Sequence, residues 1–251
     1  MRIFVTNDDG VLSPGLESLA KVAQRYGEVY IVAPDIERSG VSHAITLTHP
    51  LRAQEIRKNM WALTGTPTDC VFIGLNHLLP HRPDLVLSGI NRGPNLGADV
   101  LYSGTVGGAM EGTMQKLPAV AFSLVSRKTY DFKWSEPIMD KIVRDVVENG
   151  MPDGVMLNVN IPTPEISEFK GFKLTRLGNR FYSNEVNVRT DPRGGEYLWI
   201  GGSSVTMERT PESDTGAVYE GYASITPVKP DMMANEVMDQ LARFNSLSKD
   251  I

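Results

Sequence analysis

Short apolar runs and longer helical patterns alternate along the first half of the chain. Unbroken apolar runs bounded by Pro, Gly, Asp or Asn are typical of buried strands. Such runs predict strands at Arg2–Thr6, Glu28–Ala33, Asp84–Ser88, Ala119–Ser123 and Val155–Ile161. Apolar residues at helical spacing predict helices at Pro14–Tyr26, Pro67–Leu79, Val106–Lys116 and Glu136–Asn149. This alternation implies an α/β fold with a three-layer, doubly wound, mostly parallel and Rossmann-like sheet.

The pattern changes in the last third of the chain. From Phe172 to Val228, short β-like pieces alternate with turns rich in Gly, Asn and Asp. These short pieces predict a hairpin-rich arm. Its exposed strand edges would suit pairing between subunits. From Asp231 to Leu247 the apolar residues return to helical spacing, which predicts a C-terminal helix. We expect residues 1–251 to form a single domain that carries this arm.

Composition narrows the class of protein. The 251 residues are 41% hydrophobic, which is enough for one large α/β domain. The net charge of −5 and the lack of a basic block disfavour extended nucleic acid as a partner. Cys70 is the single cysteine, so no intramolecular disulfide forms and a core position is expected. The apolar N-terminal stretch is too short for a signal peptide or membrane span, and we therefore expect a cytoplasmic protein without membrane contact.

The first predicted strand runs directly into two neighbouring acids, Asp8 and Asp9. Adjacent carboxylates repel each other unless a cation or a shared proton lies between them. Asn-Asp-Asp-Gly is also typical of a tight turn. A hairpin would need a second strand at once, whereas Ser13 and Pro14 here suit the start of a helix. The two acids are therefore expected in a strand-to-helix loop, where open α/β sheets bind ligands.

Oxygen-bearing side chains also follow the second and third predicted strands. Ser39 lies in the loop Pro34–Gly40, and Asn91 and Asn95 lie in the glycine-rich loop Gly89–Gly97. Loops after parallel strands emerge at one edge of the sheet, so these groups should meet the two acids. A donor set made of oxygen favours Mg²⁺ or Mn²⁺ over Zn²⁺ or copper. Asn and Gly are also ordinary loop residues, so both readings of Asn91 and Asn95 remain open at this point.

Ser103-Gly104-Thr105 precedes a predicted helix of small residues. Hydroxyls and unpaired N–H groups at such a position suit a phosphate, and an ordinary Ser/Thr helix cap suits the sequence equally well. Other phosphate-binding sequences are missing, since there is no Walker A motif and no dinucleotide-binding glycine pattern. An aspartyl nucleophile of the Asp-x-Asp type is disfavoured, because Asn7 stands two residues before Asp9.

Taken together, five motifs resemble the SurE family of survival-protein nucleotidases over residues 1 to about 118. They are Asn7-Asp8-Asp9-Gly10, Pro34-Asp35 with Arg38-Ser39-Gly40, Gly65-Thr66-Pro67-Thr68-Asp69-Cys70-Val71, Ser88-Gly89-Ile90-Asn91 with Gly93, Asn95 and Gly97, and Tyr102-Ser103-Gly104-Thr105-Val106 with Ala109, Glu111 and Gly112.

This resemblance implies a metal-dependent phosphatase that hydrolyses nucleoside monophosphates to nucleoside and phosphate. A 5′-nucleotidase is expected, with 3′-nucleotidase and polyphosphate activity as further expectations. The resemblance implies one divalent ion, Mg²⁺ or Mn²⁺, held by Asp8, Asp9, Ser39 and Asn91, with Asp8 and Asp9 also catalytic. It places phosphate near Asn95, Ser103, Gly104 and Thr105, and it implies a homodimer or homotetramer. The alternative is a metal-dependent nucleotide sensor without turnover, which would need the same pocket.

Overall fold

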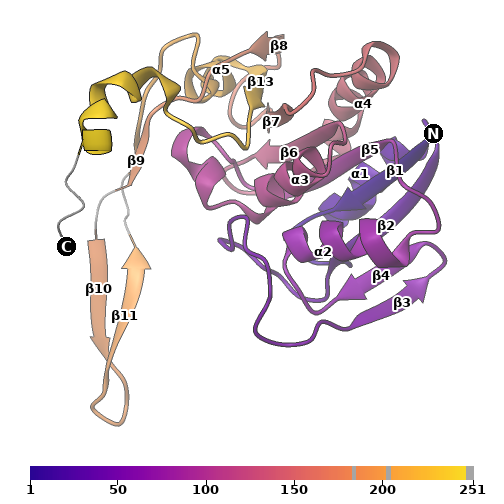
Figure 1. Cartoon of the computed structure of the whole chain (residues 1–251), viewed down its shortest axis with the longest axis horizontal. Helices are drawn as coiled ribbons and strands as arrows, with labels where there is room; N and C mark the ends of the chain where they lie inside the picture. Colours follow the sequence, from indigo (N-terminus) through magenta and orange to yellow (C-terminus); the bar gives the residue numbers. More distant parts are fainter. Residues whose placement is uncertain (183–184, 202–204, 247–251) are drawn as a thin grey trace.

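A central sheet with helices on both faces forms the body of the protein in the computed structural model, which describes residues 1–182, 185–201 and 205–246 (Figure 1). The strands of this sheet are β1 (Arg2–Thr6), β2 (Glu28–Pro34), β3 (Ala53–Arg57), β4 (Met60–Leu63), β5 (Leu85–Arg92), β6 (Ala119–Val125), β7 (Met156–Pro162), β8 (Gly171–Leu174) and β13 (Tyr222–Val228). Among the described residues their spatial order is β3-β4-β2-β1-β5-β6-β7-β13-β8. Neighbours from β4 to β7 pair in parallel, which confirms the predicted α/β class.

Alternate residues of the first strand enter two different cores, one on each face of the sheet. Ile3 and Val5 join a core with helices α1 (Pro14–Ala23) and α4 (Phe132–Asn149). Phe4 points to the other face and joins a core with α2 (Pro67–Ile73) and α3 (Gly104–Met114). Strand β1 is therefore buried on both sides, as its apolar run predicts.

The helix starts follow the expected capping chemistry. Ser13 is the N-cap of α1, and its hydroxyl accepts a hydrogen bond from the Leu16 N–H at 3.3 Å. Cys70 is fully buried in α2, as expected for a small core residue. Helix α4 begins at Phe132, one turn before the predicted start at Glu136, because Asp131 caps it. Pro137 consequently lies inside this helix and does not mark its beginning.

Two short strands were not predicted. β3 and β4 pair as an antiparallel hairpin at one edge of the sheet. All five residues of β3 are exposed, so the strand shows no alternation between apolar and polar positions. β4 is an apolar run, Met-Trp-Ala-Leu, with Met60 and Leu63 buried, and it was missed although it carries the signal from which the other strands were read.

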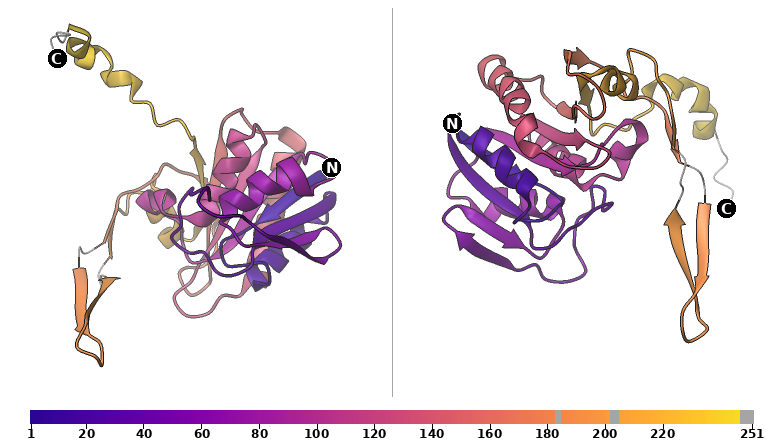
Figure 2. Two further views of the ribbon diagram at one scale, coloured as in Figure 1. Left: turned by 60° about the horizontal axis from the view of Figure 1, so that its bottom comes forward. Right: turned by 180° about the vertical axis from the view of Figure 1, so that it is seen from behind.

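The expected arm is shorter than the stretch from Phe172 to Val228. β8 and β13 belong to the central sheet, and a helix, α5 (Asp214–Glu220), lies between the arm and β13. The projecting part consists of β9 (Arg180–Tyr182), β10 (Glu185–Thr190), β11 (Glu196–Gly201) and β12 (Val205–Met207). β9 pairs with β12, and β10 with β11 forms a hairpin that extends away from the sheet (Figure 2).

The predicted C-terminal helix is present in a tighter form. Two 3₁₀ segments, Asn235–Val237 and Asp239–Ser246, occupy its place, and Leu247 lies outside the described residues. Met238, Leu241 and Phe244 are exposed on this tail. Within the described part of the chain, none of the helices combines the length and the apolar character that crossing a bilayer requires.

Candidate active site

Asp8 and Asp9 directly follow β1, in a loop that leads into α1. The Asn7 side chain fixes this loop by donating to the Gly10 carbonyl at 3.1 Å and to the Ser13 hydroxyl at 2.6 Å. A helix follows the loop, so the prediction of a strand-to-helix connection is confirmed and the hairpin reading is wrong.

The environment of both carboxyl groups disfavours their charged forms. Asp8 is 4% exposed, and burial raises its pKa to about 6, an effect that the charge of Asp9 reinforces and a hydrogen bond from Thr105 opposes. Burial also raises the pKa of Asp9, against a hydrogen bond of 3.1 Å from the Arg92 N–H to its carboxylate. A cation placed between these groups would relieve both the burial cost and the repulsion.

Ser39 and Asn91 offer two further oxygens near this pair. The Ser39 hydroxyl donates to Glu37 at 2.8 Å, which leaves its oxygen free to act as a ligand. The Asn91 amide nitrogen donates to the Gly93 carbonyl at 3.0 Å, so its amide oxygen is the atom available to a cation. Asn91 lies in the irregular end of β5, where a loop was predicted.

The end of β5 depends on a glycine. Gly89 has a φ of +127°, and a Cβ atom there would lie 2.4 Å from the Phe122 carbonyl oxygen. Both facts restrict this position to glycine. The pairing of β5 with β6 shifts register between Ser88 and Asn91. Such an irregularity redirects the strand end, and it brings Asn91 onto the same cavity as Asp8.

Asn95 is held by a network of buried amides. Its backbone N–H donates to the Asn160 side chain at 2.8 Å, and its own side chain donates to the Ser123 hydroxyl at 2.8 Å. Its carbonyl accepts bonds from Asn158 at 2.8 Å and from Asn160 at 3.0 Å. Asn158 and Asn160 were not predicted as part of the site. The feature that could have marked them is that two polar residues stand two positions apart, and so on one face, in an otherwise apolar strand.

Ser103, Gly104 and Thr105 open helix α3 next to Asp8. The Ser103 hydroxyl accepts a bond from the Val106 N–H at 3.1 Å, so the helix-cap reading is realised. A Cβ atom on Gly104 would lie 2.9 Å from the Asp8 Cβ, which shows how closely the helix start approaches the acid. The Thr105 hydroxyl is fully buried and donates to the Asp8 carboxylate. Thr105 therefore supports Asp8 directly, a contact that neither the phosphate interpretation nor the helix-cap interpretation of the sequence included.

A cavity of about 1010 Å³ joins these groups to the base of the arm. On the sheet side it is lined by Asp8, Ser39, Asn91, Asn95 and Ser103. On the arm side it is lined by Arg180, Phe181, Tyr182 and Ile200. Asp99 connects the two sides, because its carboxylate pairs with Arg180 and accepts a bond from the Tyr182 hydroxyl at 2.7 Å.

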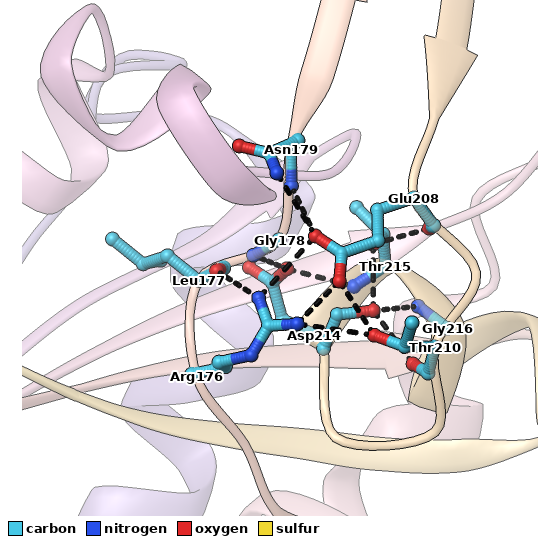
Figure 3. Close-up of polar contacts among 10 residues, drawn as sticks. Arg176, Leu177, Gly178, Asn179, Glu208, Thr210, Asp214, Thr215 and Gly216 are labelled. Carbon is cyan, nitrogen blue, oxygen red and sulfur yellow. Dashed lines mark hydrogen bonds and ion pairs between the residues drawn. The ribbon is translucent and has the colours of Figure 1, made fainter.

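Polar contacts join the two segments that lead into and out of the arm with the start of α5, as Figure 3 shows. Arg176, before β9, pairs with Glu208, directly after β12, and this contact lowers the pKa of Glu208 to about 2. The buried carboxylate of Asp214 accepts backbone N–H bonds of 2.8 Å from both Gly97 and Gly178. It thereby ties the loop that carries Asn95 and Ser103 to the arm. No local pattern of residues marks Asp214 for this role.

Conventional metal clusters are missing from the part of the chain that the structure describes. No group of three or more His, Cys, Asp and Glu side chains is arranged there to hold a metal ion. A metal at this edge would need hydroxyl and amide oxygens in addition to the two carboxylates. Ser39 and Asn91 have such oxygens available, so the donor set fits a hard divalent cation.

Comparison with known proteins agrees with this architecture. The family model described as "Survival protein SurE" matches residues 3–184. A protein of Pelotomaculum thermopropionicum named "5'-nucleotidase SurE" is 46% identical, with 99% of this chain and 97% of that protein covered. A protein of Geobacter metallireducens with the same name is also 46% identical, with 92% of each chain covered.

A solved structure extends the likeness to three dimensions. The crystal structure of the SurE protein from Aquifex aeolicus superposes with a TM-score of 0.85 at 39% identity, and it covers 98% of this chain and 100% of that one. The family model matches residues 3–184, the relatives and the solved structure match nearly the full length, and this chain belongs to the SurE family.

Proposed function

We propose that this protein is a 5′-nucleotidase, which hydrolyses nucleoside 5′-monophosphates to nucleoside and phosphate with the help of one divalent metal ion. The observation that carries the proposal is that Asp8 lines a large cavity and is followed by a second acid, Asp9, with the pKa of both carboxyl groups raised by burial. Relatives that align over more than nine tenths of this chain carry the name 5′-nucleotidase, which supports the same assignment.

Asp8, Asp9, Ser39 and Asn91 are the proposed ligands of Mg²⁺ or Mn²⁺. A divalent ion bound there would supply Lewis acidity toward a phosphoryl oxygen and toward water. Its positive charge would also favour the ionised forms of Asp8 and Asp9, whose pKa values are raised in the protein alone.

Asp8 is the proposed group that orients the attacking water or accepts its proton. With the ion bound, the Asp8 carboxylate would be ionised, so it could accept a hydrogen bond from the attacking water or take up its proton. Thr105 keeps this carboxylate in place through its hydroxyl. Asn95, Ser103 and the N–H groups at the start of α3 are the proposed partners of the remaining phosphate oxygens, because the first turn of a helix favours anions.

A homodimer or homotetramer formed through the arm is part of the same proposal. Large apolar side chains are exposed on the β10–β11 hairpin, and they are Val186, Val188, Leu198, Trp199 and Ile200. Such a surface is larger than scattered exposed residues and is typical of an interface. Activity toward 3′-monophosphates and polyphosphate, and a cytoplasmic location, stay predictions of the family resemblance.

Phosphate release from a panel of nucleoside 5′- and 3′-monophosphates tests the activity. We expect turnover that a chelator abolishes and that Mg²⁺ or Mn²⁺ restores. Full activity after exhaustive chelation would contradict the metal proposal. Tight binding of nucleotides with no phosphate release under any metal would favour the nucleotide sensor.

A further inference from the structure

The cavity holds more than a phosphate needs. Its volume of about 1010 Å³ lies at the upper end of the range of about 300–1,000 Å³ for pockets that enclose drug-sized ligands. Acidic, amide and hydroxyl groups line it on the sheet side, whereas aromatic rings line it elsewhere. This division suits a ligand with an anionic end and a flat apolar end.

Tyr102 and Tyr182 are the aromatic residues best placed for the flat end. Tyr102 lines the cavity directly before Ser103 and is 67% exposed. Tyr182 lines it from β9 and is 49% exposed. An exposed ring inside a cavity offers its face to another planar group, and stacking of this kind tolerates any base.

Asp99 joins the two tyrosines and fixes their positions. Its backbone carbonyl accepts the N–H groups of Tyr102 and Ser103, both at 3.0 Å. Its carboxylate accepts the Tyr182 hydroxyl at 2.7 Å, and the Arg180 guanidinium lies 5.1 Å from the centre of the Tyr182 ring. A ring held in this way loses little freedom when a ligand stacks on it.

We propose that the rings of Tyr102 and Tyr182 form the nucleobase subsite, so that the arm supplies the preference for nucleotides over other phosphomonoesters. The inference rests on the proposed nucleotidase function and names the part of the site that recognises the nucleoside. It also explains why the base of the arm is tied to the loop that carries Ser103.

The test compares a nucleoside 5′-monophosphate with ribose 5-phosphate, which has the same ester and no base. Effects on the phosphate and metal end cancel in the ratio of the two kcat/KM values. Tyr102→Ala and Tyr182→Ala should each lower this ratio by about 5- to 150-fold, the range that corresponds to loss of one base–aromatic stack. Tyr182→Phe keeps the ring and should keep the ratio within about threefold.

Tyr219 provides a matched control. The Arg209 guanidinium lies 5.1 Å from the centre of its ring, as Arg180 does for Tyr182, but Tyr219 is on α5 and outside the cavity lining. Tyr219→Ala should leave the ratio unchanged. An equal loss on both substrates in the Tyr102 and Tyr182 variants would overturn the subsite, and so would a loss in Tyr182→Phe as large as in Tyr182→Ala.

Calorimetric binding to metal-free protein separates this inference from the proposed function. Wild-type protein should bind the nucleoside 5′-monophosphate more tightly than ribose 5-phosphate, and Tyr102→Ala should remove most of the difference. If binding shows this pattern while no substrate is hydrolysed, the nucleotidase proposal fails and the base subsite stands. If both compounds bind wild-type protein equally, the base subsite is overturned whatever the turnover.

Discussion

The two sides of the cavity are positioned by different kinds of contact. The carboxylate wall is made of Asp8, Ser39, Asn91, Asn95 and Ser103. Its central residues are positioned by buried strands, since Asp8 lies just beyond β1 and Asn91 lies near the end of β5. The arm wall, made of Arg180, Phe181, Tyr182 and Ile200, depends on ion pairs and on the hydrogen bonds of Asp99 and Asp214.

This difference separates two properties of the protein. Side chains positioned by the hydrophobic core keep the precise geometry that a reaction needs, because a packed core resists small displacements. The side chains of Phe181, Tyr182 and Ile200 are themselves exposed, so they are easier to change without loss of the fold. We therefore expect substitutions in the carboxylate wall to affect every phosphomonoester alike, and substitutions in the arm wall to affect selectivity and assembly.

The largest effect should come from the two acids. Asp8→Asn and Asp9→Asn keep the size of the side chains and remove their charge and basicity. Each should lower kcat for all phosphomonoesters by about 10²- to 10⁴-fold, the usual effect of losing a general base. Circular dichroism checks that the fold remains. Glu17→Gln changes an exposed carboxylate on α1 and serves as the control. Near-normal turnover in both variants would show that the acids only form a turn.

The stability of the metal-free protein should report on Asp8. Its pKa is about 6 in the folded protein against 3.8 for an unperturbed group, so the folded state holds the proton to higher pH than the unfolded state. This group therefore lowers the unfolding free energy as pH rises from about 4 to about 6, by about 3 kcal/mol in total. Asp8→Asn removes that contribution. Denaturant unfolding in EDTA should show the variant gaining stability over wild type across this window, and a constant difference would refute the expectation.

Thr105→Ala should produce an intermediate loss. The Thr105 hydroxyl donates to a buried carboxylate, and such a bond contributes about 1.5–3 kcal/mol. If the bond serves the transition state, kcat/KM falls by about 10- to 150-fold. The fall should be equal for purine and pyrimidine nucleotides and for ribose 5-phosphate. Thr113→Ala removes another buried hydroxyl of α3, which donates to the Ala109 carbonyl at 3.2 Å, and should have little effect on activity. A change of base preference in Thr105→Ala would contradict a role through Asp8.

Shortening the arm should change assembly with the smallest effect on chemistry. Deletion of residues 187–199 removes Val188, Leu198 and Trp199 and keeps the cavity residue Ile200. Light scattering should show a smaller assembly, because the exposed apolar surface of the hairpin is lost. Hydrolysis of ribose 5-phosphate should stay within about threefold of wild type. An unchanged mass would remove the arm from the assembly proposal.

The parts of this protein that sequence predicts are those in which pattern and burial agree. β1, β6 and the cap of α1 were all correct, because unbroken apolar runs and a Ser-Pro start have few alternative structures. Asp8, Asn91 and Asn95 line the cavity and were selected because they follow such strands, whereas Ser103 was selected because it precedes a helix.

The parts that sequence misses depend on contacts between distant residues. β3 is exposed along its whole length, because it lies at the edge of the sheet beside β4. Asp214 lies 117 positions from Gly97, and no local pattern marks their bond. Asn160 resembles any polar residue of a strand until the fold brings it to Asn95. Tertiary structure alone distinguishes such positions from ordinary polar ones.

The hydrogen bonds of Asp214 also affect when the site can form during translation. During translation, Gly97 and Gly178 are incorporated before Asp214, whose carboxylate accepts hydrogen bonds from both. Domains begin to fold as they leave the ribosome, so β1 and β5, which position the carboxylate wall, can pair before the arm side of the cavity has formed. A nascent chain that ends before residue 214 therefore carries every residue of the carboxylate wall and lacks the tie that completes the cavity. The order of synthesis delays the finished site until the C-terminal part of the sequence has been translated.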